Sequence, residues 1–151
     1  MNLKLKLKLP LIAAVFAIAS LSACGGGGSN NGPATPVYSP AALVKTDIIV
    51  GTGAEATVGK DVTVHYTGWL YNTTVANFKG TQFDSSIGSS PYPFTVGAGV
   101  VAGFSQGVTG MKVGGKRTVL IPSELGYGSR GTDGVPGNSG LVFDIELVEV
   151  R

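Results

Sequence analysis

The chain has 151 residues, of which 43% are hydrophobic and only 13% charged, enough for one packed domain of ordinary size. The formal net charge is +2, but Lys4, Lys6 and Lys8 lie at the extreme N-terminus, and after Cys24 eight Lys/Arg face nine Asp/Glu. This near-neutral body has no basic stripe, so we expect no nucleic-acid partner. Gly occurs 24 times, well above a usual share of about 7%, which favours tight turns and a β-rich fold.

The first 24 residues have the pattern of an export signal. A basic start, MNLKLKLK, precedes the apolar run LPLIAAVFAIAS and then LSAC, and the apolar run is too short to span a bilayer comfortably. Small residues before a cysteine resemble the lipobox of bacterial lipoproteins, in which the signal is cut before the cysteine and the cysteine carries the lipid. The resemblance implies a signal peptide at 1–23 and lipidation of Cys24. An ordinary secretory signal with an unrelated cysteine is the alternative.

Residues 24–43 are predicted to form a flexible tether after the lipidated cysteine. The stretch GGGGSNNGPATPVYSPAA is nearly uncharged and has no apolar periodicity. About 18 such residues reach roughly 25 Å r.m.s.. Gly25 follows Cys24, and no Asp stands there to indicate retention at the inner membrane. We therefore expect a lipid-anchored protein of the bacterial cell envelope, on the periplasmic or surface face of the outer membrane.

From Val44 onward strand patterns dominate, and we place the functional domain at 44–151. DIIVGTG is a short apolar run that ends in a glycine turn. In DVTVHYTGWL, Val62, Val64 and Tyr66 share one face, and KRTVLIP and LVFDIELVEV alternate in the same way. Such alternation is typical of antiparallel strands with one wet face.

The segment VVAGFSQGVTGMKVGG breaks this alternation. Its apolar residues recur at spacings of three and four, at Val101, Phe104, Val108 and Met111. This spacing predicts one helix with an apolar face, ended by Gly114-Gly115. Because glycines weaken the helix, it needs a sheet to hold it. The expected fold is α+β, with one short helix lying across a twisted antiparallel sheet.

The patterns of hydrolases and metalloenzymes are absent from the sequence. The only His, His65, lies within a predicted strand, and no Gly-x-Ser-x-Gly elbow occurs. One Cys and one His make no metal-ligand cluster and no intrachain disulfide, so we expect neither a metal nor another cofactor. Counting leaves a glycosidase carboxylate pair open, although Asp84 is the only acid inside an aromatic-rich segment.

Five blocks in one order resemble the FKBP-type peptidyl-prolyl cis-trans isomerases. The blocks are VTVHYTGWL, QFDSS, VVAGFSQGVTGMKVGGKRTVLIP, LGYG and LVFDIEL, and the resemblance covers roughly residues 44–151. It implies a twisted antiparallel sheet wrapped around one short helix. It also implies an enzyme that accelerates rotation of Xaa-Pro bonds in client proteins, and a pocket for the macrolide ligands of the family. A non-catalytic chaperone or surface interaction lipoprotein that binds proline segments is the alternative.

The resemblance further implies which side chains form the pocket. Catalytic roles fall on Tyr66, Asp84, Phe104 and Tyr127, and substrate binding on Phe83, Tyr92, Phe94, Val100, Val101 and Phe143. Phe104 stands where the family usually has a Trp under the proline ring. The loops GAGVVAG and GSRGTDGVPGNSG are each about one residue short, and the extended hairpin YNTTVANFKG is expected to add an edge to the pocket rim.

Asp84 is expected to act as an acceptor rather than as a general acid. Rotation of an Xaa-Pro bond must break amide resonance, with a barrier of about 18–20 kcal/mol, but it needs no nucleophile or proton relay. We expect Asp84 to stay ionised and to hold the Tyr66 hydroxyl or polarise the pocket. A turn cap formed with Ser85 and Ser86 is the alternative. Nothing in the sequence indicates an oligomer, so we expect a monomer.

Overall fold

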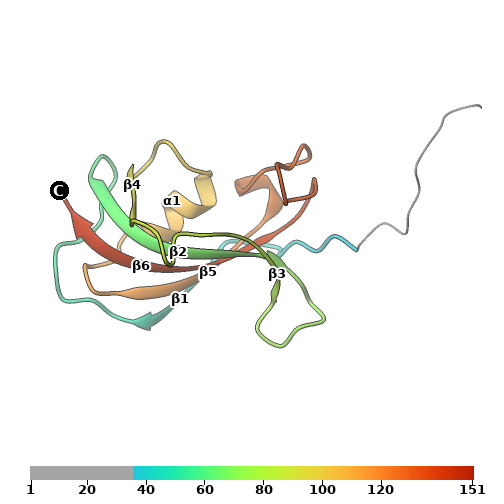
Figure 1. The fold of residues 1–151 in the computed structure, drawn as a ribbon, viewed down its shortest axis with the longest axis horizontal. Coiled ribbons are helices and arrows are strands. Elements are labelled where there is room, and N and C mark those ends of the chain that lie inside the picture. The colour runs from blue at the N-terminus through green and yellow to red at the C-terminus, as the bar shows by residue number, and fades with distance from the viewer. Residues whose placement is uncertain (1–35) are drawn as a thin grey trace, which may run out of the picture. The chain divides into compact units, whose positions relative to one another are not determined.

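The structure, a computed structural model, describes residues 36–151, so the predicted signal peptide and Cys24 lie outside the described residues. The described chain contains six strands, one α-helix and one short 3-10 helix (Figure 1). In chain order these are β1 (Val44–Ile49), β2 (Asp61–Tyr71), β3 (Lys79–Ser85), β4 (Tyr92–Thr95), α1 (Ala102–Val108), β5 (Lys116–Ile121), η1 (Ser123–Leu125) and β6 (Leu141–Val150). Within residues 36–151, no helix has the length and apolar character that crossing a membrane requires.

The strands form one antiparallel sheet, and α1 lies against one of its faces (Figure 1). The strand order is β1-β5-β6-β2-β3, and β4 pairs with the first part of β2. In the centre of the sheet, Gly68 on β2 and Val119 on β5 both lie opposite Phe143 on β6. The predicted α+β fold, a twisted antiparallel sheet with one short helix, is thereby confirmed.

The two faces of each central strand differ as the alternation predicts. On β6 the side chains that face α1 are at most 4% exposed, and they are Leu141, Phe143, Ile145 and Leu147. Asp144 and Glu146 point to the opposite face and are half-buried. The core therefore lies between α1 and the sheet, where apolar side chains leave water together.

Helix α1 lies close against β5 because two of its residues are glycines. A Cβ atom added at Gly103 would clash with the side chain of Ile121. One added at Gly107 would lie 2.8 Å from Cγ2 of Val119, closer than packed carbon atoms approach. The glycines that lower helix propensity thus permit the contact with the sheet that stabilises the helix.

The prediction that the helix ends at Gly114-Gly115 is wrong, because α1 already ends at Val108. The backbone leaves the helical path at Thr109, which has a ψ of 128°, and Gly110 follows with a φ of +82° and donates its N–H to the carbonyl of Ala56 at 2.8 Å. Met111 still packs in the core, at 3% exposure. The apolar spacing therefore identified the buried side chains correctly but overestimated the length of the helix.

Arg117 on β5 satisfies the carbonyl groups at the end of α1. Its guanidinium donates to the carbonyl of Gly107 at 2.8 Å and to that of Thr109 at 3.1 Å. It also pairs with Asp47 on β1 at 2.5 Å, and this hydrogen bond lowers the pKa of the Asp47 carboxyl. A cation at a helix C-terminus is favourable because the carbonyl ends carry partial negative charge.

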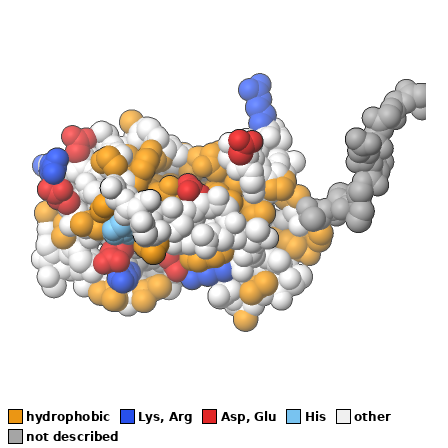
Figure 2. Space-filling model, in the orientation of Figure 1, with side chains coloured by type: hydrophobic (Ala, Val, Ile, Leu, Met, Phe, Trp, Pro, Cys, Tyr) orange, Lys and Arg blue, Asp and Glu red, His pale blue; other side chains and the backbone are white. Residues whose placement is uncertain are grey.

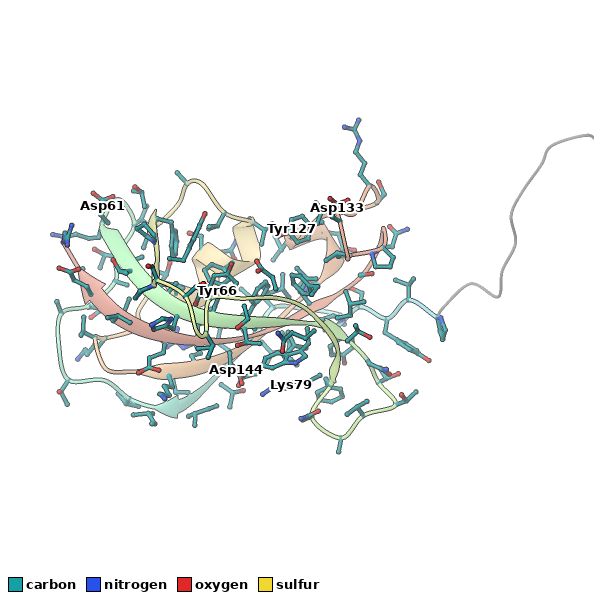
Figure 3. The ribbon with its side chains drawn as sticks, in the orientation of Figure 1. Asp61, Tyr66, Lys79, Tyr127, Asp133 and Asp144 are labelled. Atoms are coloured by element: carbon teal, nitrogen blue, oxygen red, sulfur yellow. The ribbon has the colours of Figure 1, made fainter. Side chains whose placement is uncertain are left out.

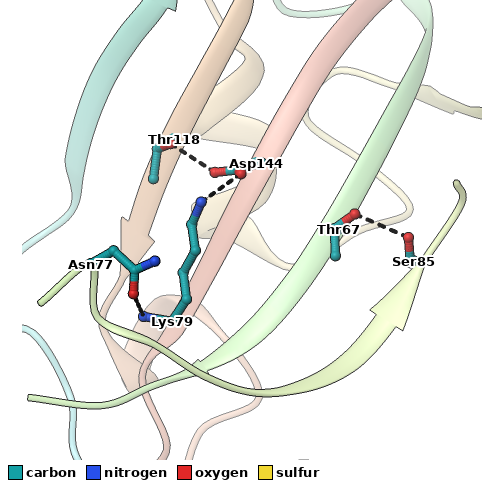
Figure 4. A network of polar contacts seen from close by, with 6 residues as sticks. All are labelled: Thr67, Asn77, Lys79, Ser85, Thr118 and Asp144. Atoms are coloured by element: carbon teal, nitrogen blue, oxygen red, sulfur yellow. Dashed lines mark hydrogen bonds and ion pairs between the residues drawn. The ribbon is translucent and has the colours of Figure 1, made fainter. Parts of the chain in front are cut away.

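The face of the sheet opposite α1 carries a network of polar contacts (Figure 4). Oγ1 of Thr118 donates to Asp144 at 2.7 Å, and Nζ of Lys79 donates to the same carboxylate at 2.6 Å. The hydroxyl groups of Thr67 and Ser85 lie 3.0 Å apart and join β2 to β3. These contacts join β5 to β6, β6 to β3, and β2 to β3 through side chains on this face.

Residues 36–43, which the sequence analysis assigns to the tether, also contact the domain. The N–H of Gly140 donates to the carbonyl of Tyr38 at 2.7 Å. The N–H of Ser123 donates to Oγ of Ser39 at 2.9 Å. Residues 36–43 therefore already pack against the domain whose expected start is residue 44.

Candidate functional site

A cavity of about 600 Å³ opens on the α1 side of the sheet. Figure 2 shows hydrophobic side chains gathered over this side of β2, with a carboxylate visible among them. Figure 3 shows Tyr66 and Tyr127 on this side, with Lys79 and Asp144 toward the opposite side. The lining residues come from four strands, α1 and two loops, and they are Tyr66, Asp84, Tyr92, Gly99, Val100, Val101, Phe104, Tyr127 and Phe143.

Two phenylalanines form the floor of the cavity. Phe104 and Phe143 are each 4% exposed, and their ring centroids lie 5.0 Å apart in an edge-to-face arrangement. The ring of Tyr66 meets both edge-on, at 5.6 Å from Phe104 and 6.0 Å from Phe143. Because each ring fixes its neighbours, the floor is a rigid apolar surface.

A glycine on β2 makes room for this floor. Gly68 lies opposite Phe143, and an added Cβ atom would lie 2.7 Å from that ring and 2.8 Å from the ring of Phe83. Phe83 meets Phe143 edge-on at 5.6 Å. The close approach of the two rings to the backbone therefore requires glycine at this position.

Tyr66 and Asp84 form the polar contact of the cavity wall. The Tyr66 hydroxyl donates to Oδ2 of Asp84 at 2.7 Å, and Oδ1 accepts the N–H of Ser85 at 2.8 Å. The structure therefore shows the acceptor role for Asp84, and the N–H of Ser86, which the alternative turn cap would use, donates to the carbonyl of Tyr66 instead. No Lys or Arg of residues 36–151 lies within 4.0 Å of this carboxylate.

Ser86 holds the backbone of Tyr66 from the neighbouring chain segment. Its Oγ accepts the Tyr66 N–H at 2.9 Å, and its own N–H donates to the Tyr66 carbonyl at 2.9 Å. The same hydroxyl lies 3.2 Å from Nδ1 of His65, and Ser86 is only 6% exposed. Sequence reasoning considered Ser86 only as a turn residue, because a contact between β2 and the end of β3 depends on strand register.

The environment of the cavity keeps Tyr66 and Tyr127 protonated. Burial raises the pKa of Tyr66 well above its ordinary value, and the hydrogen bond to Asp84 raises it further. Burial also raises the pKa of Tyr127, followed by the negative charge of Asp84. The Tyr127 hydroxyl makes no hydrogen bond to another residue of 36–151, so it is available to donate to a ligand.

The rim beside α1 is built on a glycine that sequence reasoning missed. Gly99 lines the cavity and adopts a φ of +78°, a conformation that favours glycine. Just before it, the N–H of Gly97 donates to Oγ of Ser105 in α1 at 2.7 Å, which fixes the turn to the helix. The glycine-rich stretch GAG was the available signal, but it predicts a turn without saying what the turn faces.

The structure gathers most of the predicted site residues around this cavity. Phe83 and Phe94 do not line it and instead support the lining rings, Phe94 by an edge-on contact with Phe104 at 5.5 Å. The loop between β2 and β3 does not line it either, so the extended hairpin adds no edge to this rim. Cys24, the predicted lipidation site, lies outside the described residues.

The cavity is suited to bind a small apolar group that is attached to a polar group. The described residues contain no group of three or more His, Cys, Asp and Glu side chains that could hold a metal. An aromatic floor, a carboxylate held by Tyr66 and a free phenol donor suit a compact ring that is attached to a carbonyl group. A proline within a peptide has this combination.

Comparisons with known proteins agree with this reading of the cavity. Residues 53–148 match the family model described as "FKBP-type peptidyl-prolyl cis-trans isomerase". An "FK506-binding protein" of Neisseria meningitidis serogroup A is 49% identical over 111 residues, which cover 72% of this chain and 95% of that relative.

Two solved structures share both fold and sequence with the chain. The structure of FkpA from Escherichia coli matches with a TM-score of 0.63 and 36% identity over 76% of this chain, which spans about half of that protein (51%). The structure of AtFKBP13 matches with a TM-score of 0.62 and 39% identity, over 75% of this chain and 96% of the other. The matched residues 53–148 include α1, strands β2 to β5, most of β6 and every residue that lines the cavity, and the chain belongs to the FKBP-type peptidyl-prolyl cis-trans isomerase family.

Proposed function

We propose that this chain accelerates cis-trans rotation of Xaa-Pro bonds in proteins of the bacterial cell envelope, with the cavity of about 600 Å³ as its active site. The observation that carries this proposal is the combination of Phe104 and Phe143 as an apolar floor with the Tyr66–Asp84 pair at its side. This arrangement fits a proline ring beside a polarised amide, whose rotation requires no nucleophile.

The proposed mechanism is stabilisation of the twisted amide. The planar amide carries charge separation that resonance maintains, and rotation reduces it. An apolar cup therefore favours the twisted state over the planar one, and only such differential stabilisation raises the rate. A difference of about 1.4 kcal/mol corresponds to roughly tenfold in rate.

The polar groups have separate roles in this mechanism. Tyr127, with its free and protonated hydroxyl, donates to a substrate carbonyl and orients the peptide. Asp84 accepts from Tyr66 and fixes that ring against the floor. The negative charge of Asp84 also places an electrostatic field across the rotating bond, where partial charges change during the reaction.

The test is cis-trans exchange of an Xaa-Pro peptide, followed by NMR with a catalytic amount of the protein. We expect faster exchange, which Tyr127→Phe weakens and Phe104→Ala largely removes. Unchanged exchange would contradict the proposal. If peptide resonances still shift on stoichiometric addition, the outcome is instead the non-catalytic proline-binding module.

We further propose that the chain acts as a monomer on a lipid anchor at Cys24, on the periplasmic or surface face of the outer membrane, with extracytoplasmic proteins as clients. The support is the basic start, the short apolar run and LSAC before the glycine-rich stretch. Mass spectrometry of the mature N-terminus tests this, with Cys24→Ser as the control. An unmodified Cys24 in a processed chain would contradict the anchor.

Binding of FK506-type macrolides belongs to the same proposal. Its support is the aromatic floor together with the FK506-binding protein of Neisseria meningitidis at 49% identity. A macrolide that competes with the proline peptide for the cavity would be displaced by excess peptide in a titration. Simultaneous binding of both would place the macrolide elsewhere.

A further inference from the structure

The segment before β1 reaches the loop that carries Tyr127. We call residues 36–43 the strap and residues 122–140 the Tyr127 loop. The family model matches residues 53–148, so the strap lies outside the residues that this model matches. In Figure 1 the strap is the cyan segment that passes near the base of the orange-red Tyr127 loop.

The strap is hydrogen-bonded to both ends of the Tyr127 loop. At the first end, Oγ of Ser39 accepts the N–H of Ser123 at 2.9 Å, and Ser123 is 7% exposed. At the second end, the carbonyl of Tyr38 accepts the N–H of Gly140 at 2.7 Å. Two consecutive residues of the strap thus hold together two ends that are far apart in the sequence.

Packing at the second end depends on a glycine. A Cβ atom added at Gly140 would clash with Cδ of Pro40 and would lie 2.8 Å from Cα of Ser39. Gly140 has no positive φ, so its backbone conformation does not itself require glycine. The small residue is therefore explained by the close approach of the strap.

The first end leads directly to the backbone on both sides of Tyr127. The carbonyl of Ser123 accepts the N–H of Gly126 at 3.0 Å and that of Gly128 at 2.9 Å. The carbonyl of Gly128 in turn accepts the N–H of Asn138 near the second end, at 2.8 Å. A continuous set of hydrogen bonds thus joins the strap to the residues that flank Tyr127.

We propose that Ser39 is a positioning residue for substrate binding and that the strap orders the Tyr127 loop in its binding-competent form. This inference rests on the proposed function, because it acts through Tyr127 in the same cavity. If the strap is released, a smaller fraction of molecules has Tyr127 in place, and apparent affinity falls by that fraction. The floor and the Tyr66–Asp84 pair lie outside the loop, so the rate of the bound substrate changes little.

The experiment compares variants of the full chain in which one side of the contact is changed at a time. Ser39→Ala removes the hydroxyl oxygen that accepts the N–H of Ser123. Gly140→Ala adds a methyl group to the loop where the strap now lies, and so displaces the strap. Ser39→Thr keeps the hydroxyl and is the rescue variant. Thr52→Ala is the matched control, because it removes an exposed hydroxyl that makes no side-chain hydrogen bond.

Three measurements separate positioning from general stability. These are KM and kcat for an Xaa-Pro peptide, the dissociation constant of the peptide by titration, and amide hydrogen exchange across the domain. For Ser39→Ala and Gly140→Ala we expect KM to rise about three- to tenfold with kcat within about twofold, and faster exchange confined to residues 122–140. The double variant should raise KM by less than the product of the two single effects, since each substitution acts by releasing the same strap.

The proposal is overturned by either of two outcomes. Unchanged KM and dissociation constant in both single variants would mean that the strap does not position the loop. Faster exchange throughout the sheet, together with loss of kcat, would mean a merely structural role. If the unaltered chain binds the peptide but does not catalyse, the proposed function fails, and the dissociation constants and exchange rates still decide the role of the strap.

Discussion

Each face of the central sheet carries an aspartate, and the two aspartates have different partners. On the face away from α1, Asp144 accepts from Thr118 and pairs with Lys79 at 2.6 Å. On the face toward α1, Asp84 accepts from Tyr66 and from a backbone N–H, and no cation of the described residues pairs with it. Asp144, whose charge is paired with a cation, stabilises the contact between strands. Asp84, which is held only by neutral donors of the described residues, keeps an unpaired negative charge at the cavity.

The largest effect on stability and activity should come from removing the ring of Phe104 from the cavity floor. Phe104→Ala empties a site that is 4% exposed and surrounded by other rings, so we expect a loss of about 3–5 kcal/mol in the free energy of unfolding. Activity should fall with it. Chemical denaturation measures the first effect and peptide exchange the second.

Phe104→Leu is the control for the floor, because it keeps an apolar side chain of moderate volume. We expect it to retain most of the stability and to lose activity through the missing ring. A loss of less than about 1 kcal/mol in Phe104→Ala would contradict the role of this ring as a packed floor.

Next in size is the effect of removing the negative charge of Asp84, on the α1 side of the sheet. Asp84→Asn keeps an oxygen that can accept from Tyr66 but has no negative charge. A hydrogen bond to a charged group contributes about 1.5–3 kcal/mol, so we expect the rate to fall by about tenfold or more with the fold retained. Full activity in a folded Asp84→Asn protein would show that the charge has no role in catalysis.

The same substitution on the opposite face should have a smaller and different effect. Asp144→Asn weakens the contact with Lys79, but side-chain exposures of 22% for Lys79 and 38% for Asp144 mean that solvent screens the pair. We expect the free energy of unfolding to fall by about 1 kcal/mol at most and KM and kcat to stay unchanged. A loss of activity comparable to that of Asp84→Asn would remove the distinction between the faces.

The smallest effect is expected from raising the pH. The pKa values of Tyr66 and Tyr127 lie above their ordinary value of 10.0 because burial disfavours the phenolate. Their contribution to stability is therefore fully present below pH 10.0 and is lost only as the pH rises through the higher folded values. We expect constant kcat/KM from about pH 7 to 10, and a decline centred below pH 10 that Tyr127→Phe abolishes would contradict it.

Much of the fold was predictable because it depends on local chemistry. Alternation in β2, β5 and β6 identified the buried and exposed sides of each strand, and the resemblance named the aromatic side chains that surround the cavity. Gly99 and Ser86 escaped prediction for one reason. Their roles depend on backbone conformation and on which strands are neighbours, and neither is encoded in a short window of sequence.

The end of α1 illustrates the same limit. The spacing of Phe104, Val108 and Met111 correctly placed all three in the core, yet Met111 reaches the core from beyond the helix. The backbone leaves the helical path at Thr109, and the N–H of Gly110 then donates to the carbonyl of Ala56, more than fifty positions earlier in the chain. Apolar periodicity reports burial, and burial is compatible with more than one backbone path.

By itself, the sequence determined the α+β class and the polarity of each strand face, because side-chain hydrophobicity and strand period act locally. The family resemblance indicated which aromatic side chains surround the cavity. Only the tertiary structure decided that Asp84 meets Tyr66 and that Ser39 reaches Ser123, 84 positions away. Hydrogen bonds need partners within about 3 Å, and strand order and loop closure set which groups come that close.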